Sequence, residues 1–173
     1  SPKDMKCFHL SDTIDHVSEL ALKETSTTAV LPETMLLVAR SGILKHSIPV
    51  AITTRRMTIN QDIKGVTPLR KNASVYFYAW FIEGHQSELL TEWRKEGATV
   101  ESLDLERVKN CALPFPPLAE QAAIARYLDV ETAKLDALIG KVEEAIERLQ
   151  EFRTALITAA VTGKIDVRKA AAA

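Results

Sequence analysis

The sequence predicts an α+β protein in which a globular domain of mixed strands and helices is followed by one long C-terminal helix. Two observations support this prediction. Short β-branched and apolar runs bounded by turn-forming residues recur in the first part of the chain, as is typical of strands. From Leu118 onward the composition is instead rich in Ala, Leu, Glu and Lys, with no proline and with Gly140 as the one glycine before the C-terminal end of the pattern.

Four segments of the first region carry the strand pattern. The runs "MLLVAR" and "IPVAITT" are apolar or β-branched, and "MTIN" and "IKGVTPL" continue the pattern. We therefore expect strands within residues 35–40, 48–54, 57–60 and 63–69.

The period then changes to that of a helix. The segment "SVYFYAWFIEGHQSELLTEWRK", residues 74–95, predicts one or two helices with Ser74 as the N-cap and an interruption near Gly84. Its aromatic residues, like Trp93, are expected to belong to the core, because aromatic residues on a helix are more often buried than used to stack bases. "ESLDLERVK", residues 101–109, predicts a short helical turn.

The C-terminal region repeats large apolar residues every seven positions over four heptads, as a coiled coil does. The predicted seam consists of Leu135, Leu138, Val142, Ile146, Leu149, Phe152 and Leu156. Residues 132–161 would span about 45 Å as a helix. Burying each large seam side chain contributes about 1.5–3 kcal/mol, so a second helix is expected to cover the seam. The alternative is that the seam packs on the globular domain of the same chain.

The helix is expected to end at Gly163, a natural C-cap, with Lys164 next to the terminal carbonyls. The letters "TGK" resemble part of a phosphate-binding loop. That interpretation fails because the loop needs a glycine where Thr158 stands, and because such a loop opens a helix whereas this one closes it.

Three prolines separate the two regions. "CALPFPPLAEQ" contains Pro114, Pro116 and Pro117 just before the helix pattern. Proline disrupts a strand ladder but is tolerated in a first helical turn. We expect a rigid joint, with Pro116 and Pro117 setting the angle of the domain on its helix.

The expected organisation has three parts. Residues 1–116 form the globular domain and residues 117–168 form the helical spacer, whose seam mediates pairing. Residues 169–173 resemble a cloning remnant rather than part of the fold.

The net charge of −1 conceals one basic band. Residues 35–75 carry seven Lys or Arg and one acid, Asp62, which gives +6, whereas residues 1–34 and 76–110 each sum to −3. Such a band can be an ordinary solvated surface. The more specific alternative is that it binds nucleic acid.

The composition argues against several other classes of protein. No apolar run has the length of a membrane helix, and two cysteines are too few for a disulfide framework, which predicts a protein of a reducing compartment. The four histidines have no neighbours at metal-ligand spacing, and no catalytic constellation is present. We therefore expect no catalytic residue, no metal and no cofactor.

The sequence also resembles a known family. "LPFPPLAEQAAIARYLD", followed by "LDALI", "LQEFRTALI" and "AAVTGKIDVR", is similar to the conserved region of specificity subunits from type I restriction-modification systems. "LLVARSGILKHSIPVAI", "TINQDIKGVTPL" and "GATVESLDLERVKNCALPFPPL" look like a target recognition domain of the same family. The resemblance covers nearly the whole chain.

This resemblance implies a cytoplasmic, non-catalytic subunit that binds double-stranded DNA. In the family, two target recognition domains are separated by two long helices that pair antiparallel, and the subunit positions methyltransferase (M) and restriction (R) subunits. Since this chain has one domain and one helix, it is expected to read half of a bipartite site and to pair through an antiparallel coiled coil with a second copy or a second half. Two identical copies would prefer an interrupted palindrome.

The residues expected to contact DNA come mainly from the basic band: Arg40, Ser41, Lys45, His46, Arg55, Arg56, Asn60, Gln61, Lys64 and Thr99. Alternatives remain open for some of them. Arg40 could form a surface ion pair, Asn60 and Gln61 could brace a loop, and Thr99 could cap the following turn.

A rival function is that of a coiled-coil adaptor that binds only protein. It explains the helical region completely, but it leaves the basic band without a role.

Overall fold

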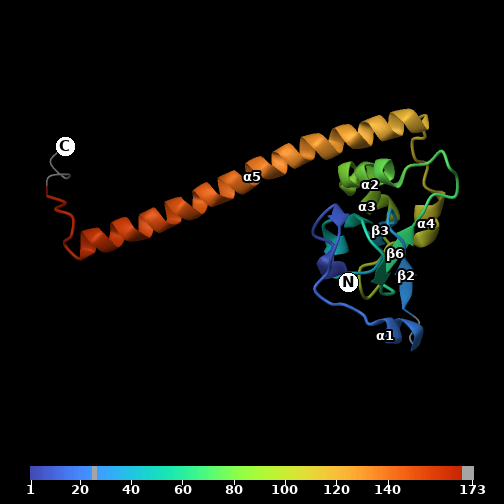
Figure 1. Cartoon of the computed structure of the whole chain (residues 1–173), viewed down its shortest axis with the longest axis horizontal. Helices are drawn as coiled ribbons and strands as arrows, with labels where there is room; N and C mark the ends of the chain where they lie inside the picture. Colours follow the sequence, from blue (N-terminus) through green and yellow to red (C-terminus); the bar gives the residue numbers. More distant parts are fainter. Residues whose placement is uncertain (25–26, 169–173) are drawn as a thin grey trace. The chain divides into compact units, whose positions relative to one another are not determined.

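The computed structural model describes residues 1–24 and 27–168, so the remnant expected at residues 169–173 lies outside the described residues. The chain forms two compact units, of which the first comprises residues 1–126 and the second begins at Tyr127. The predicted α+β class is confirmed, because a mixed unit of strands and helices is followed by one long helix (Figure 1).

A four-stranded sheet lies at the centre of the first unit. Its strand order is β1 (His9–Leu10), β4 (Val50–Thr53), β3 (Met35–Val38), β6 (Ile63–Val66). β1 is parallel to β4, and β3 is antiparallel to both β4 and β6. Every residue of β3 and β4 is buried, as expected of central strands covered on both faces.

A second, two-stranded sheet joins β2 (Thr28–Val30) to β5 (Met57–Ile59) in antiparallel register. Strands β3 to β6 fall inside the four predicted segments, so those predictions are confirmed. β1 and β2 were not predicted, because two or three residues are too few to show an alternating pattern.

Three helices of the first unit lie at the predicted positions, whereas α1 (Glu19–Glu24) was not predicted. α2 (Val75–Gly84) and α3 (Gln86–Trp93) are separate helices, and the Ser74 hydroxyl accepts a hydrogen bond from the Phe77 amide at the start of α2. α4 (Leu105–Asn110) is the predicted short helical turn. The other helical elements are α1 and two 3₁₀ turns, η1 (Pro2–Asp4) and η2 (Gly42–Lys45).

The aromatic residues of α2 and α3 belong to the core, as predicted. Phe77 and Trp93 are buried, and Tyr76, Tyr78 and Phe81 pack against the core with part of each ring exposed. Helix α2 packs on strands β4 and β3. These rings therefore close one face of the sheet and are not presented to solvent as a stacking platform.

Helix α5 (Leu118–Val161) runs without interruption for 44 residues, or about 66 Å (Figure 1). It ends as predicted: Gly163 has a φ of 73°, and the Lys164 amide donates a hydrogen bond to the Ala159 carbonyl at 2.8 Å. In the second unit the predicted seam residues are 47–66% exposed.

The first turns of α5 belong to the first unit, where the side chain of Gln121 is fully buried. Its Oε1 accepts a hydrogen bond from the Ser74 amide at 2.8 Å. Its Nε2 donates to the Asn72 carbonyl at 3.1 Å and to the Pro116 carbonyl at 2.8 Å. One amide group therefore satisfies three backbone groups from two separate loops.

Replacing Gln121 tests the importance of this buried amide. Gln121→Leu keeps the approximate volume of the side chain but leaves one backbone donor and two acceptors unpaired, so we expect it to lower the free energy of unfolding by about 2–4 kcal/mol. Urea denaturation measures this change. The control is Gln150→Leu, the same substitution at an exposed position of α5, which should change the free energy by less than about 0.5 kcal/mol. Equal effects of the two substitutions would contradict the role given to Gln121.

Candidate nucleic-acid interface

Half of the residues predicted to contact DNA line one cleft of the first unit. The cleft has a volume of about 920 Å³, and Arg55, Arg56, Asn60, Gln61 and Lys64 are among its lining residues. The two arginines lie in the turn that joins β4 to β5, Asn60 and Gln61 lie in the turn after β5, and Lys64 lies in β6. Folding therefore brings both ends of a three-residue strand to the same cleft.

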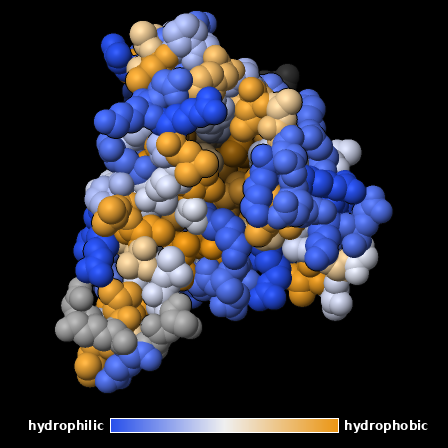
Figure 2. All heavy atoms as spheres, turned by 90° about the vertical axis from the view of Figure 1, so that its right-hand side faces the viewer, coloured by the Kyte–Doolittle hydropathy of each residue, from blue (hydrophilic) through white to orange (hydrophobic). Residues whose placement is uncertain are grey.

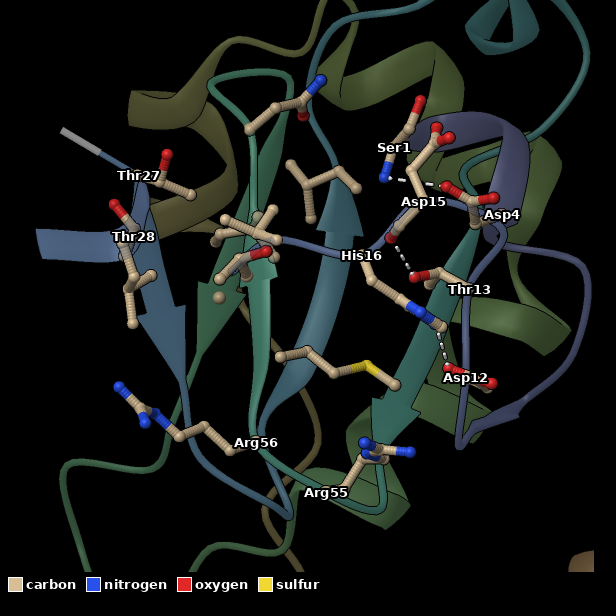
Figure 3. A pocket seen from close by; sticks show the side chains of 18 of the residues that line it. Ser1, Asp4, Asp12, Thr13, Asp15, His16, Thr27, Thr28, Arg55 and Arg56 are labelled. Atoms are coloured by element: carbon tan, nitrogen blue, oxygen red, sulfur yellow. Dashed lines mark hydrogen bonds and ion pairs between the residues drawn. The ribbon is translucent and has the colours of Figure 1, made fainter. Parts of the chain in front are cut away.

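The opposite wall of the cleft is acidic, which the sequence did not predict. Asp12 and His16 form a pair with 2.9 Å between Oδ1 and Nε2, and Asp15 pairs with Lys3 at 2.9 Å. The hydrogen bond with His16 lowers the pKa of Asp12, and the charge of Arg55 lowers it further. Figure 3 shows Asp12 and His16 on the segment that faces the strands joined by the turn with Arg55 and Arg56.

Because an ionised Asp12 repels phosphate, the charge of the cleft is not uniformly favourable to DNA. Arg55 and Arg56 are exposed. These two arginines can thus meet a phosphate from the solvent side without bringing that phosphate deep between the walls.

Asp62 connects Arg40 to the turn between β5 and β6. The Arg40 Nε donates to Asp62 Oδ1 at 2.7 Å, and the backbone amides of Ala39 and Arg40 donate to the Asp62 carbonyl at 2.7 and 3.1 Å. The surface ion pair considered for Arg40 is therefore present. The Arg40 side chain is still 52% exposed, so it remains accessible to a ligand.

Asn60 and Gln61 brace the same turn. The Asn60 Oδ1 accepts a hydrogen bond from the Asp62 amide at 3.1 Å, and the Gln61 carbonyl accepts one from the Lys64 Nζ at 3.1 Å. The first bond is an Asx turn, which fixes the local backbone. The structural interpretation of Asn60 is thus supported by its contacts, while the Gln61 side chain is exposed at the cleft.

A second group of predicted residues surrounds η2. The Ser41 hydroxyl accepts a hydrogen bond from the Ile43 amide and caps η2, Lys45 is exposed in its last turn, and His46 follows as its C-cap. The Ser41 amide donates to the Glu101 carbonyl at 3.0 Å. Ser41 therefore has a structural role at this position.

Glu101 holds the neighbouring loop against η2. Its carboxylate forms an ion pair with Arg94, with 2.6 Å between Oε1 and Nη2. The hydrogen bond from Arg94 lowers the pKa of Glu101, and the charge of Lys45 lowers it further. Lys45 thus lies in the field of an ionised carboxylate, which offsets part of its attraction for phosphate.

Thr99 lies at an exposed bend of the loop that ends at Glu101. The prediction that Thr99 could cap the following turn is wrong. Asp104 is the N-cap of α4, and its Oδ1 accepts hydrogen bonds from the amides of Glu106 and Arg107 at 3.0 and 3.3 Å.

The predicted residues therefore form two neighbouring groups. Arg40 joins the turn at Asn60–Lys64 through Asp62, and Ser41 and Lys45 meet the loop bearing Thr99 through Glu101. The sequence did not reveal Asp62 and Glu101 as connecting residues, because each acts over a long sequence separation. One feature of the sequence could have pointed to Asp62, because it is the one acidic residue of the basic band.

Other kinds of site find little support in the described residues. Within residues 1–24 and 27–168 there is no group of three His, Cys, Asp or Glu that could hold a metal ion. No helix in this part of the chain is long and apolar enough to cross a membrane. On the face of the molecule shown in Figure 2, hydrophobic side chains occur in scattered groups among hydrophilic ones.

Residues 11–148 match the family model described as the type I restriction modification DNA specificity domain. The type I restriction enzyme EcoR124I/EcoR124II specificity subunit of Escherichia coli is 31% identical over 153 residues, which are 88% of this chain and 37% of that protein. The EcoBI specificity subunit of the same organism is 40% identical over 67 residues, 39% of this chain and 14% of that protein.

A solved structure has a similar fold. It comes from work described as the structural basis underlying complex assembly and conformational transition of the type I R-M system. The TM-score is 0.63 at 20% sequence identity, and the match covers 77% of this chain and 31% of that chain. This chain spans little more than a third of the length of the first relative and less than a third of the similar structure.

The contacts of Arg40 and Asp62 predict different effects on stability. Asp62→Ala removes acceptors used by Arg40 and Asn60, so we expect it to lower the free energy of unfolding by about 1–2 kcal/mol. Arg40→Ala removes one exposed ion pair and should cost less than about 1 kcal/mol. Urea denaturation of both variants checks this order. A larger loss for Arg40→Ala would show that Arg40 is a structural brace and not a residue available to a ligand.

Proposed function

The chain belongs to the type I restriction modification DNA specificity domain family, and we propose that it reads one half of a bipartite double-stranded DNA site. It does so as part of a specificity subunit of a type I restriction-modification enzyme. The observation that supports this proposal is the +6 band of residues 35–75 in a chain with net charge −1, because three of its cations, Arg55, Arg56 and Lys64, line one cleft.

Within the proposed interface the residues have different roles. Arg55 and Arg56 are exposed on a turn, where their guanidinium groups can bind phosphates and supply affinity. Arg40 is held by Asp62 through Nε, a contact that fixes the direction of its side chain. A positioned guanidinium suits the bidentate recognition of a guanine edge, so Arg40 is the strongest candidate for base readout.

Lys45, His46, Lys64 and Thr99 are proposed as further DNA contacts. Lys64 is bonded to the Gln61 carbonyl, and Lys45 is exposed beside Glu101. Because lysine presents a compact charge on a flexible stem, it suits phosphate better than a base edge. These residues are proposed to position the domain on the duplex and not to select the sequence.

The helical region is proposed to act as a spacer. Residues 132–161 of α5 span about 45 Å, and one turn of DNA rises about 34 Å, so two readers at the ends of a paired spacer can reach separate turns. The exposed seam is proposed to pair antiparallel with a second copy or a second half of the same kind. Two identical readers related by a twofold axis would recognise an interrupted palindrome.

The proposed partners besides DNA are the methyltransferase and restriction subunits, and this chain is proposed to supply no catalytic residue. The chemistry on the DNA would then belong to the methyltransferase partner, including any extraction of the target base. The chain would select the place where that chemistry occurs.

The rival function is a coiled-coil adaptor that binds only protein, which the exposed seam would also serve. The two functions differ in their response to salt. A DNA reader should bind duplex DNA with an affinity that falls steeply as salt rises, whereas an adaptor should be indifferent to DNA at every salt concentration.

Duplex binding by the chain and two double variants tests the proposal. Arg55→Ala with Arg56→Ala should weaken binding and reduce the slope of log affinity against log salt by up to about two, one for each lost phosphate contact. Arg107→Ala with Lys109→Ala removes the same charge from α4, away from the basic band, and should leave the slope nearly unchanged. Fluorescence anisotropy measures both. Equal losses in the two variants, or no binding at low salt, would contradict the proposed interface.

A further inference from the structure

Three segments leave the same end of the four-stranded sheet. β3 lies between β4 and β6, and its first residue, Met35, pairs with residues near the C-terminal ends of both neighbours. The turn before β3, residues 31–34, therefore lies between the turn after β4, residues 54–56, and the loop after β6, residues 67–72. We refer to these three segments together as the turn end of the sheet.

The turn end is basic. Its two outer segments carry four exposed cations: Arg55, Arg56, Arg70 and Lys71. The last two belong to the basic band but were not predicted to contact DNA. The one acid of the three segments is Glu33, which accepts a hydrogen bond from the Tyr76 hydroxyl at 3.5 Å. Because neighbouring strands are about 4.8 Å apart, the two pairs of cations follow strands that are about 10 Å apart.

The central turn holds an exposed leucine on a fixed backbone. Leu31 is 69% exposed. The buried Thr53 hydroxyl donates a hydrogen bond to the Leu31 carbonyl at 2.7 Å and accepts one from the Thr34 amide at 3.1 Å. The Glu33 amide donates to the Thr53 carbonyl at 2.7 Å. Three hydrogen bonds to one residue of β4 therefore fix the backbone that carries Leu31.

Leu31 also lies close to one pair of cations. Val30 pairs with Met57 in the sheet of β2 and β5, so the next positions along these two strands are Leu31 and Arg56. Leu69 is fully exposed as well, but it belongs to an outer segment of the turn end. Of the two leucines, Leu31 is the one that lies between the two pairs of cations.

This arrangement suits DNA better than another anionic surface. Proteins that insert apolar side chains between base pairs do so from the minor groove and contact the DNA with Lys or Arg. The minor groove is about 6 Å wide, so long cationic side chains from strands about 10 Å apart can reach phosphates on both of its borders. An anionic membrane would instead require a wide apolar face, such as that of an amphipathic helix.

We propose that Leu31 is a wedge that enters double-stranded DNA between two base pairs from the minor groove, while the two pairs of cations bind phosphates on both strands. This inference rests on the proposed DNA binding and adds a residue that acts on base stacking. A wedge has to keep its direction while it separates bases, and the hydrogen bonds of Thr53 provide that rigidity. Because flexible steps unstack more easily, the wedge favours pyrimidine–purine steps.

Duplexes with and without a central gap of one nucleotide test the wedge. Stacking is already broken at the gap, so the full chain should bind the gapped duplex at least about fivefold more tightly than the intact duplex of the same sequence. Leu31→Ala should abolish this preference, because alanine is too short to separate bases. Leu31→Met keeps a long apolar side chain and should retain it. Fluorescence anisotropy measures the affinities.

Two further variants locate the effect at the turn end. Leu69→Ala removes the same side chain from an outer segment and should leave the preference for the gapped duplex unchanged. Arg70→Ala with Lys71→Ala should weaken the binding of both duplexes equally and reduce the slope of log affinity against log salt by up to about two. Because all the altered side chains are exposed, circular dichroism should show an unchanged fold.

The outcomes distinguish the wedge from the proposed function. A preference that persists in Leu31→Ala, or that falls as much in Leu69→Ala, would overturn the wedge but leave salt-dependent DNA binding intact. Equal affinities of the unaltered chain for the two duplexes would do the same. Tighter binding to vesicles of phosphatidylserine and phosphatidylcholine than to either duplex would assign the turn end to a membrane surface and overturn the wedge. Binding of neither duplex at low salt would remove both proposals.

Discussion

The buried amide of Gln121 is the interaction on which the closure of the first unit depends. The start of α5, the loop before α2 and the proline run meet at this side chain. It forms hydrogen bonds with the Ser74 amide and with the Asn72 and Pro116 carbonyls. The Ser74 amide that it binds lies at the N-cap of α2, and α2 covers the central strands. Proline has no backbone N–H, so the proline run offers few backbone donors. The hydrogen bond to the Pro116 carbonyl is donated instead by the Gln121 side chain.

Much of the fold could be predicted because its elements are long or periodic. The heptads of α5, the Ser74 cap and the break after Gly84 are local signals that packing did not override. β1 and α1 escaped prediction because short elements have no period and owe their form to neighbours distant in sequence. The contacts of Gln121 could not be predicted, because nothing in one residue's identity reveals hydrogen bonds made almost 50 positions away.

The candidate site was predictable as a set of cations but not as an arrangement. The charge count singled out residues 35–75, and folding gathers much of that set at one cleft and one turn. The count could not show that Asp62 holds Arg40, that Glu101 lies beside Lys45, or that Asp12 faces Arg55. In each case a carboxylate limits or directs a cation. The proposed interface would be selective for this reason, because unpaired cations bind any phosphate whereas positioned ones favour particular contacts.

We propose that residues 35–75 determine which DNA sequence is modified. The most direct measurement is to reconstitute the chain with its cognate methyltransferase subunits, replace residues 35–75 by the corresponding residues of another member of the family, and sequence the modified sites. We expect the recognised bases to change in the half-site proposed for this chain while the spacing between half-sites is retained, since α5 is untouched. An active complex with an unchanged methylation pattern would contradict it.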